Sequence, residues 1–225
     1  MTLYSYCIPV DDGAAPNPYW GVCTLTICKP VIRRTAKIGD WIIATGSKNS
    51  SIGNISKKVV YIMRVSKKLS LEDYDKYCKK YLPNKIPKVT SSDYRRKVGD
   101  CIYDFSNKEL KLRKGVHDSS NLPVDLGGVY SLLSNKFWYF GDQPIDLPVE
   151  LQPIIKSGQG HRSKSNQEYL GKFLQWVNNL KSKRNKLMGK PQIKINFKKY
   201  EDNDCADIRC KSGKKDEIEC VKGIC

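Results

Sequence analysis

The sequence predicts an α+β fold in which short strands form a small, strongly curved β-barrel with two or more flanking helices. Short runs rich in β-branched and aromatic residues recur through the first two-thirds of the chain, and clusters of Gly, Pro, Asn and Ser separate them. Two longer segments show helical spacing instead. The 225 residues are 40% hydrophobic and 28% charged, which is enough for one domain with a real core. We expect that domain over residues 1–200 and a cysteine-rich tail over 201–225.

The predicted strands follow one another with turn residues between them. A hairpin is expected where Ser106-Asn107-Lys108 separates two of the runs. A last strand is expected where apolar residues alternate over Gln192–Phe197. The other expected strands are Leu3–Ile8, Val22–Cys28, Trp41–Thr45, Val59–Val65, Cys101–Phe105, Glu109–Leu112, Val129–Leu133 and Lys136–Phe140.

Two helices interrupt these strands. Ser70 is placed to cap the first, which presents Leu71, Tyr74, Cys78 and Leu82 on one face before Pro83 ends it. The second should begin at the capping box Ser165-Asn166-Gln167-Glu168. Its apolar face is then Leu170, Phe173, Leu174, Val177 and Leu180.

Charge is the most informative property of the composition. The formal net charge is +17, and because residues 201–225 hold seven acidic and five basic side chains, residues 1–200 carry about +19. A field of this size attracts polyanions, so DNA, RNA or a nucleotide is the expected partner. A solvated, lysine-rich surface is the alternative.

The chain has no apolar run of bilayer length and no signal-peptide pattern at its start. We therefore expect a cytoplasmic protein with no membrane partner. Nine cysteines, an odd number, argue against a secreted disulfide framework in that setting.

Two polar loops are candidate ligand sites. Pro16 and Pro18 make a rigid loop that presents Asn17, Tyr19 and Trp20. The Gly-rich turn 158–163 precedes a helix, so its backbone N–H groups and Arg162 are placed to bind phosphate, with His161 as a proton carrier. A flexible connector is the alternative for this turn. We expect Asn17, Tyr19, His161 and Arg162 to line one pocket.

Other titratable residues are candidates for catalysis. His117 is the second histidine of the chain and is either a proton carrier or a structural residue. Asp125 follows it by eight residues, and the two suggest an acid–base pair or a metal ligand set. Asp100 follows a glycine, where an aspartate can act in catalysis or satisfy a turn. Cys23 and Cys28 offer one nucleophile or buried structural thiols.

Trp41 and Tyr103 lie beside turns, as residues that stack on a base would, although most aromatic residues should belong to the core. The tail holds Cys205, Cys210, Cys220 and Cys225 in two evenly spaced pairs. Four thiolates can bind a structural zinc ion, and two disulfides or a disordered tail are the alternatives.

A series of short blocks runs through most of the chain in a fixed order. They are Tyr4-Ser5-Tyr6, Ala15-Pro16-Asn17-Pro18, Cys23-Thr24-Leu25, Cys28-Lys29-Pro30, Arg33, Gly39-Asp40-Trp41, Gly99-Asp100-Cys101-Ile102-Tyr103, His117, Phe137-Trp138-Tyr139-Phe140-Gly141 and Gly158-Gln159-Gly160-His161-Arg162. Together these blocks resemble the family called nucleotide modification associated domain 2, over roughly the first 190 residues. The resemblance implies an association with DNA or nucleotide modification. Lys29 and Arg33 lie in these blocks and are further candidates for ligand binding.

A second resemblance covers a shorter stretch. Gly39-Asp40-Trp41-Ile42-Ile43-Ala44, followed by Val60-Tyr61-Ile62-Met63-Arg64-Val65, is similar to barrel strands of the PUA-like superfamily, whose members read bases. Any antiparallel strand pair joined by a polar loop is the alternative.

Three functions fit these features. The first is binding of nucleic acid or nucleotide with recognition of a modified base, in a DNA-modification or defence context. The second is an enzyme that acts on such a base or nucleotide, with His161 and Arg162, and His117 and Asp100, as its candidates. The third is a regulatory interaction protein. A deep pocket that contains His161, Arg162 and Asn17 would favour the enzyme, and a shallow basic groove would favour binding.

Overall fold

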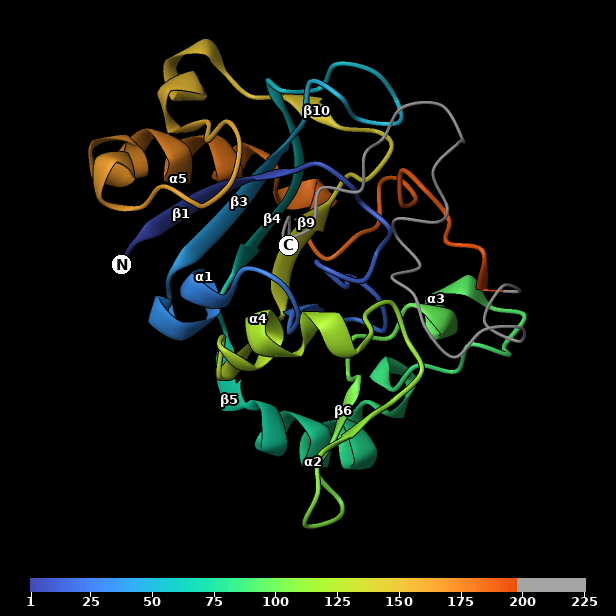
Figure 1. Ribbon diagram of the computed structural model, residues 1–225. Helices are drawn as coiled ribbons and strands as arrows, with labels where there is room; N and C mark the ends of the chain where they lie inside the picture. The colour runs from blue at the N-terminus through green and yellow to red at the C-terminus, as the bar shows by residue number, and fades with distance from the viewer. Residues whose placement is uncertain (198–225) are drawn as a thin grey trace.

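The computed structural model describes residues 1–197 as a mixed α+β fold with open sheets (Figure 1). The largest sheet has the order β1-β3-β4-β10, and β9 also pairs with β4. A second sheet has the order β2-β8-β5, and β6 pairs with β7. The strands are β1 Leu3–Ile8, β2 Cys23–Leu25, β3 Trp41–Gly46, β4 Lys58–Arg64, β5 Lys67–Ser70, β6 Tyr103–Asp104, β7 Lys111–Leu112, β8 Tyr130–Ser134, β9 Lys136–Tyr139 and β10 Ile145–Asp146.

The centre of the large sheet is buried on both faces. β1 runs parallel to β3 with Leu3 opposite Trp41, and β3 runs antiparallel to β4 with a bulge beside Ala44. All six residues of β3 are buried, which explains why this strand is an almost continuous apolar run.

Alternate residues of these strands point into two separate cores. Leu3, Ile43 and Trp138 pack beneath α5 (Leu170–Asn179), which covers one face of the sheet (Figure 1). Ile42 and Tyr61 point to the other face, together with residues of α1 (Pro30–Thr35) and of the second sheet. The large sheet therefore separates the α5 side of the molecule from the α1 side.

Helix α2 (Leu71–Tyr81) confirms the first predicted helix. The Ser70 hydroxyl accepts a hydrogen bond from the Asp73 N–H at 3.0 Å, and Tyr74 and Cys78 are buried. The remaining helical segments are α3 Tyr94–Lys97, α4 Leu122–Leu126 and the 3-10 turns Pro83–Lys85, Ser119–Asn121, Val149–Ile154, Lys164–Tyr169 and Lys181–Lys183.

The predicted start of the second helix is wrong. A 3-10 turn occupies Lys164–Tyr169, and α5 begins at Leu170 without a side-chain cap. Tertiary contacts explain the difference, because the Asn166 amide donates to the Leu3 carbonyl at 3.0 Å and to the Ser5 hydroxyl at 2.9 Å. The predicted apolar face is confirmed in part by Phe173 and Val177, which are buried.

Two further strand predictions need correction. Gln192–Phe197 is not a strand, although Ile195 and Phe197 are buried as the alternation predicts, because this segment pairs with no strand within residues 1–197. The segment 22–28 is a strand only over β2, since Cys28 has a left-handed backbone. The hairpin is confirmed, with Tyr103 opposite Leu112.

The α+β class is confirmed, but the strands of residues 1–197 close no barrel. β4 pairs with both β9 and β10 on one edge, and the free edge of β1 bonds to a loop at Arg162 instead of to another strand. The PUA-like barrel is therefore not confirmed.

Candidate active site

A strained turn between β2 and α1 carries the thiol of Cys28. Cys28 has φ 60° and Lys29 has φ 43°, and both values lie in the left-handed region that non-glycine residues rarely adopt. Pro30, whose ring fixes φ in the helical range, then starts α1. Strain of this kind costs about 1–3 kcal/mol per residue and is concentrated at functional sites. The fold therefore holds Cys28 in one defined place.

His117 joins this thiol to a buried carboxylate. The His117 Nε2 atom lies 3.6 Å from the Cys28 Sγ atom, and the His117 Nδ1 atom lies 2.6 Å from an oxygen of Asp125. All three side chains are buried. The order thiol, imidazole and carboxylate is the arrangement in which an imidazole takes a proton from a nucleophile while a carboxylate orients the ring.

The Asp125 carboxylate accepts hydrogen bonds from three groups. Its carboxylate accepts from the Cys28 N–H at 2.7 Å and from the Tyr103 hydroxyl at 2.8 Å, in addition to His117. Burial by itself would raise the pKa of Asp125, but His117, the Cys28 N–H and the nearby Arg33 charge outweigh it and hold the pKa below its ordinary value. An ionised Asp125 accepts from His117 Nδ1–H, so Nε2 is left to accept the thiol proton.

Arg33 connects the two halves of the site through backbone carbonyls. Its guanidinium donates to the carbonyls of Cys28 at 2.7 Å, Asp125 at 2.5 Å and Tyr130 at 3.0 Å. Gly128 makes room for it, because a Cβ atom at that position would overlap the guanidinium group. Arg33 is a predicted ligand-binding residue, but its side chain is fully buried. Its guanidinium instead positions Cys28 and Asp125 through their backbone carbonyls.

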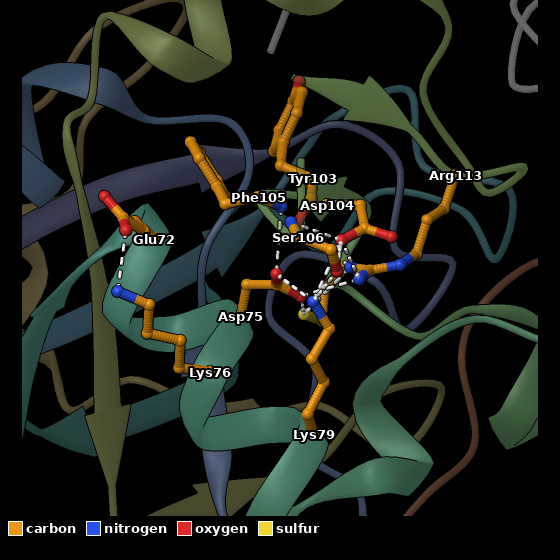
Figure 2. A network of polar contacts seen from close by, with 10 residues as sticks. Glu72, Asp75, Lys76, Lys79, Tyr103, Asp104, Phe105, Ser106 and Arg113 are labelled. Atoms are coloured by element: carbon orange, nitrogen blue, oxygen red, sulfur yellow. Dashed lines mark hydrogen bonds and ion pairs between the residues drawn. The ribbon is translucent and has the colours of Figure 1, made fainter. Parts of the chain in front are cut away.

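A network of ion pairs anchors the strand that carries Tyr103. Asp75 on α2 pairs with Lys79 at 2.6 Å and with Arg113 at 2.7 Å, and Lys79 also reaches Asp104 at 2.9 Å. Figure 2 shows the Tyr103 hydroxyl pointing away from this cluster, which lets it reach Asp125 instead. The network thus fixes β6 against α2 while Tyr103 contributes to the thiol site.

Asp100 and Asn17 belong to a different buried network. The Asp100 carboxylate accepts from the Thr24 hydroxyl at 2.5 Å and from the Tyr74 hydroxyl at 2.7 Å. The Lys85 ammonium donates to the Asn17 side chain at 2.6 Å and to Thr24 at 2.9 Å. Burial lowers the pKa of Lys85, and Asp100 opposes that effect. These contacts tie the proline-rich loop to the core.

His161 and Arg162 lie at the free edge of β1. The His161 ring packs 5.7 Å from the Tyr4 ring, and burial lowers the pKa of this histidine. Ser5 and Arg162 exchange two backbone hydrogen bonds at 2.8 and 2.9 Å. The Asn17 side chain bonds to Val98 and Lys85, whereas the Arg162 side chain bonds to Ser165 and Ile155, and the predicted common pocket stays a prediction.

The remaining predicted ligand residues make different contacts. Lys29 Nζ sits 4.9 Å from the centre of the Tyr6 ring beside the thiol turn. Tyr19 is buried, which raises the pKa of its hydroxyl, and Trp20 packs against the Arg95 guanidinium at 4.7 Å. Trp41 packs in the α5 core against Trp138 and Phe173.

Sequence reasoning identified His117 with Asp125 as an acid–base or metal pair but did not join Cys28 to them. The local signal was a cysteine two residues before the proline that begins a helix, because cysteine thiols near helix N-termini are often reactive. No group of three His, Cys, Asp or Glu residues within 1–197 has the geometry of a metal site. The predicted zinc ligands Cys205, Cys210, Cys220 and Cys225 lie outside the described residues.

The fold and this site define the class: an α+β domain with a thiol, an imidazole and a carboxylate in one buried chain of contacts. The chain belongs to the family nucleotide modification associated domain 2, whose model matches residues 1–199. This confirms the family resemblance and places the domain in a nucleotide-modification context. No curated protein and no solved structure matches the chain. Within residues 1–197, no helix has both the length and the apolar character needed to cross a membrane.

Proposed function

We propose that this domain is a thiol-dependent enzyme that removes or transfers an acyl group carried by a nucleotide or nucleic acid. Cys28 is the nucleophile, His117 the general base and acid, and Asp125 the residue that orients the imidazole. One observation carries the proposal: the unbroken contact chain from Cys28 Sγ through His117 to Asp125.

The contacts support the following steps. His117 Nε2 takes the Cys28 proton, and the thiolate attacks a carbonyl carbon of the substrate. The C–N or C–O bond breaks, the leaving amine or alcohol takes the proton from His117, and a thioester remains on Cys28. Water gives a proton to His117 and attacks the thioester carbonyl carbon, the C–S bond breaks, and the Cys28 thiolate takes that proton back from His117. The sum is substrate plus water to a carboxylic acid, which ionises in solution, plus the amine or alcohol.

The strained turn supports the same assignment by analogy. α/β-Hydrolases place a serine nucleophile on a sharp strand-to-helix turn, which exposes the reacting atom and fixes its direction. Cys28 occupies such a turn between β2 and α1, with its own backbone N–H bonded to Asp125. Two contacts therefore set the position of Cys28 relative to Asp125. One is the bond from the Cys28 N–H to Asp125, and the other is the contact of the Cys28 thiol with His117, which bonds to Asp125.

The substrate class rests on the family and on charge. The family name refers to nucleotide modification, and residues 1–200 carry about +19. An acyl group on an exocyclic base amine or on a sugar hydroxyl combines a carbonyl electrophile with the negative charge that this surface attracts.

A direct test is turnover of deoxynucleosides, their 5′-monophosphates and short oligonucleotides that carry an acylated base amine. Cys28→Ala should lower the rate at least ~1,000-fold, as loss of a nucleophile does. Cys23→Ala is the matched control, because Cys23 is also buried and burial raises the pKa of its thiol to about 12. Acid quenching should trap a thioester on Cys28. Turnover unchanged in Cys28→Ala would contradict the proposal.

The second candidate function is binding of nucleic acid with recognition of a modified base and no catalysis. The exposed positive charge and the Tyr4–His161 ring pair at the edge of β1 favour it. Tight, salt-sensitive binding of the same probes with no turnover and no thioester would favour this candidate over the enzyme.

A further inference from the structure

A small cavity lies on the α5 side of the large sheet, away from the thiol site. Its volume is ≈ 90 Å³, enough for several waters or one small anion, because a single water needs only about 10–15 Å³ by this measure. Its walls come from β3, β9, α5 and the turn after α5. The lining residues are Trp41, Lys136, Trp138, Leu174, Val177, Asn178, Lys181 and Arg184.

Basic side chains gather around this cavity. Lys136, Lys181 and Arg184 line it, and Arg64 on β4 stands directly opposite Lys136 in the strand register. No acidic side chain within residues 1–197 forms an ion pair with any of these four. Like charges directly opposite each other on neighbouring strands destabilise a sheet. A bound anion would therefore stabilise this one by reducing the repulsion between Lys136 and Arg64.

Burial and the neighbouring positive charges lower the pKa of Lys136. Burial lowers the pKa of its ammonium first, and the charges of Arg64, Arg184 and Lys181 lower it further. The negative end of the α5 dipole accounts for a positive charge at Lys181, which lies just beyond the C-terminus of that helix. It does not explain Lys136 and Arg64, which come from strands.

A buried donor at the same cavity lacks a partner. Trp41 is 3% exposed, and its Nε1–H makes no hydrogen bond within residues 1–197. The neighbouring Trp138 Nε1–H donates to the Leu180 carbonyl at 2.7 Å. An unpaired buried donor costs about 1–3 kcal/mol, so the Trp41 Nε1–H, unlike that of Trp138, is available to a bound acceptor.

Backbone contacts position the turn that carries Arg184. Asn185 donates from its backbone to the Phe137 carbonyl at 2.7 Å and accepts from the Phe137 N–H at 3.1 Å. These two bonds fix the turn after α5 against β9 and place Arg184 beside Lys136. Lys136 Nζ lies 5.3 Å from the centre of the Trp41 ring, so the ammonium sits over the indole.

We propose that this cavity binds a phosphate group of a nucleotide or nucleic acid, with Lys136, Lys181, Arg184 and the Trp41 Nε1–H as its donors. Trp41 belongs to the core beneath α5 and Cys28 to a different core, so this site is distinct from Cys28 and does not depend on thiol chemistry. A second phosphate contact on the far face of the sheet would let the domain hold a substrate longer than one nucleotide.

The test uses the full chain with Lys136→Met and Arg184→Met, which remove charge and keep an apolar stem. Lys172→Met is the matched control, because Lys172 is exposed on α5, loses the same charge and does not line the cavity. The probes are a fluorescein-labelled single-stranded oligonucleotide followed by anisotropy, and a deoxynucleoside 5′-monophosphate followed by tryptophan fluorescence. Thermal unfolding of each variant, with and without the monophosphate, is measured in parallel.

Each cavity variant should weaken binding ~10-fold and lower the slope of log K against log salt by about 0.7 for the single strand. Lys172→Met should change affinity less than ~2-fold at 0.15 M salt, where distant charges are screened. Loss with both probes supports a phosphate site of either source, loss with the oligonucleotide alone assigns it to a polymer backbone, and loss with the monophosphate alone assigns it to a free nucleotide. Affinities equal to those of Lys172→Met for both probes, or no binding to the wild-type chain at low salt, would overturn the proposal.

Discussion

Replacing Asp125 with asparagine should destabilise the domain and disable Cys28 together. The carboxylate accepts from Cys28 N–H at 2.7 Å, Tyr103 hydroxyl at 2.8 Å and His117 Nδ1 at 2.6 Å. Asparagine keeps one oxygen for the Cys28 N–H and turns an amide donor toward the other two. The His117 ring then accepts at Nδ1 and carries its proton on Nε2, which is the wrong tautomer for taking the thiol proton.

The size of the effect follows from these bonds. A hydrogen bond to a charged group contributes about 1.5–3 kcal/mol and a neutral bond about 1 kcal/mol. Two bonds weakened in this way, with the nearby Arg33 charge no longer compensated, amount to about 3 kcal/mol in the free energy of unfolding. A domain of this size should then lose about 6–12 °C in Tm.

Urea and thermal unfolding measure this change. Asp146→Asn is the matched control, because the Asp146 side chain is 83% exposed and its pairing with Lys58 is a surface contact. That control should stay within about 0.5 kcal/mol of the wild type. If Asp125→Asn unfolds at the same urea concentration as Asp146→Asn, the hydrogen bonds of Asp125 do not stabilise the fold.

Three other perturbations test the same contacts. Gly128→Ala should displace the Arg33 guanidinium and cost about 2–4 kcal/mol by urea unfolding, whereas Gly171→Ala, in open space on α5, should stabilise by about 0.5–1 kcal/mol; equal effects would contradict the close packing. The depressed pKa of Asp125 gives stability that is present above about pH 4 and is lost as pH falls through the folded-state pKa, so the wild type should lose stability more steeply than Asp125→Asn between pH 5 and 2. Lys85→Met should cost about 3–5 kcal/mol, because it leaves buried acceptors unpaired, and a change below 1 kcal/mol in calorimetry would speak against that role.

Local pattern predicted the elements whose contacts are local. Leu3–Ile8 is a strand with exactly the expected limits, and Ser70 caps α2 as its position before an apolar face predicts. The apolar face of α5 was also predictable, but its start was not. Asparagine is a residue type that favours helix caps. The Asn166 amide instead donates to Leu3 and Ser5 of β1, more than 160 positions away in the sequence.

The candidate site was predictable only in pieces. His117 and Asp125 are eight residues apart and could be joined by inspection, whereas Cys28 lies 89 residues before His117. No periodicity reports a contact at that separation. Arg33 is the reverse case, since an arginine close to a cysteine-containing loop is as typical of ligand binding as of the buried structural role it has here.

The clustering of charge at the α5 cavity was likewise beyond sequence pattern. The basic residues after α5 predict a solvated helix end or, as the alternative, a phosphate contact, and Lys136 is predicted only as part of a strand. Only the register of β4 with β9 and the turn held by Asn185 bring them to one place.

Activation of the Cys28 thiol by His117 should appear in the pH dependence of Cys28 alkylation by iodoacetamide. Chymotryptic peptides separate Cys28 from Cys23, because Leu25 lies between them, so mass spectrometry reports each thiol in the same sample. We expect Cys28 to react with a midpoint below the ordinary thiol pKa of ~8.5, and His117→Asn to move that midpoint above it while Cys23 stays unreactive. A Cys28 midpoint that is the same in the wild type and in His117→Asn would contradict the account.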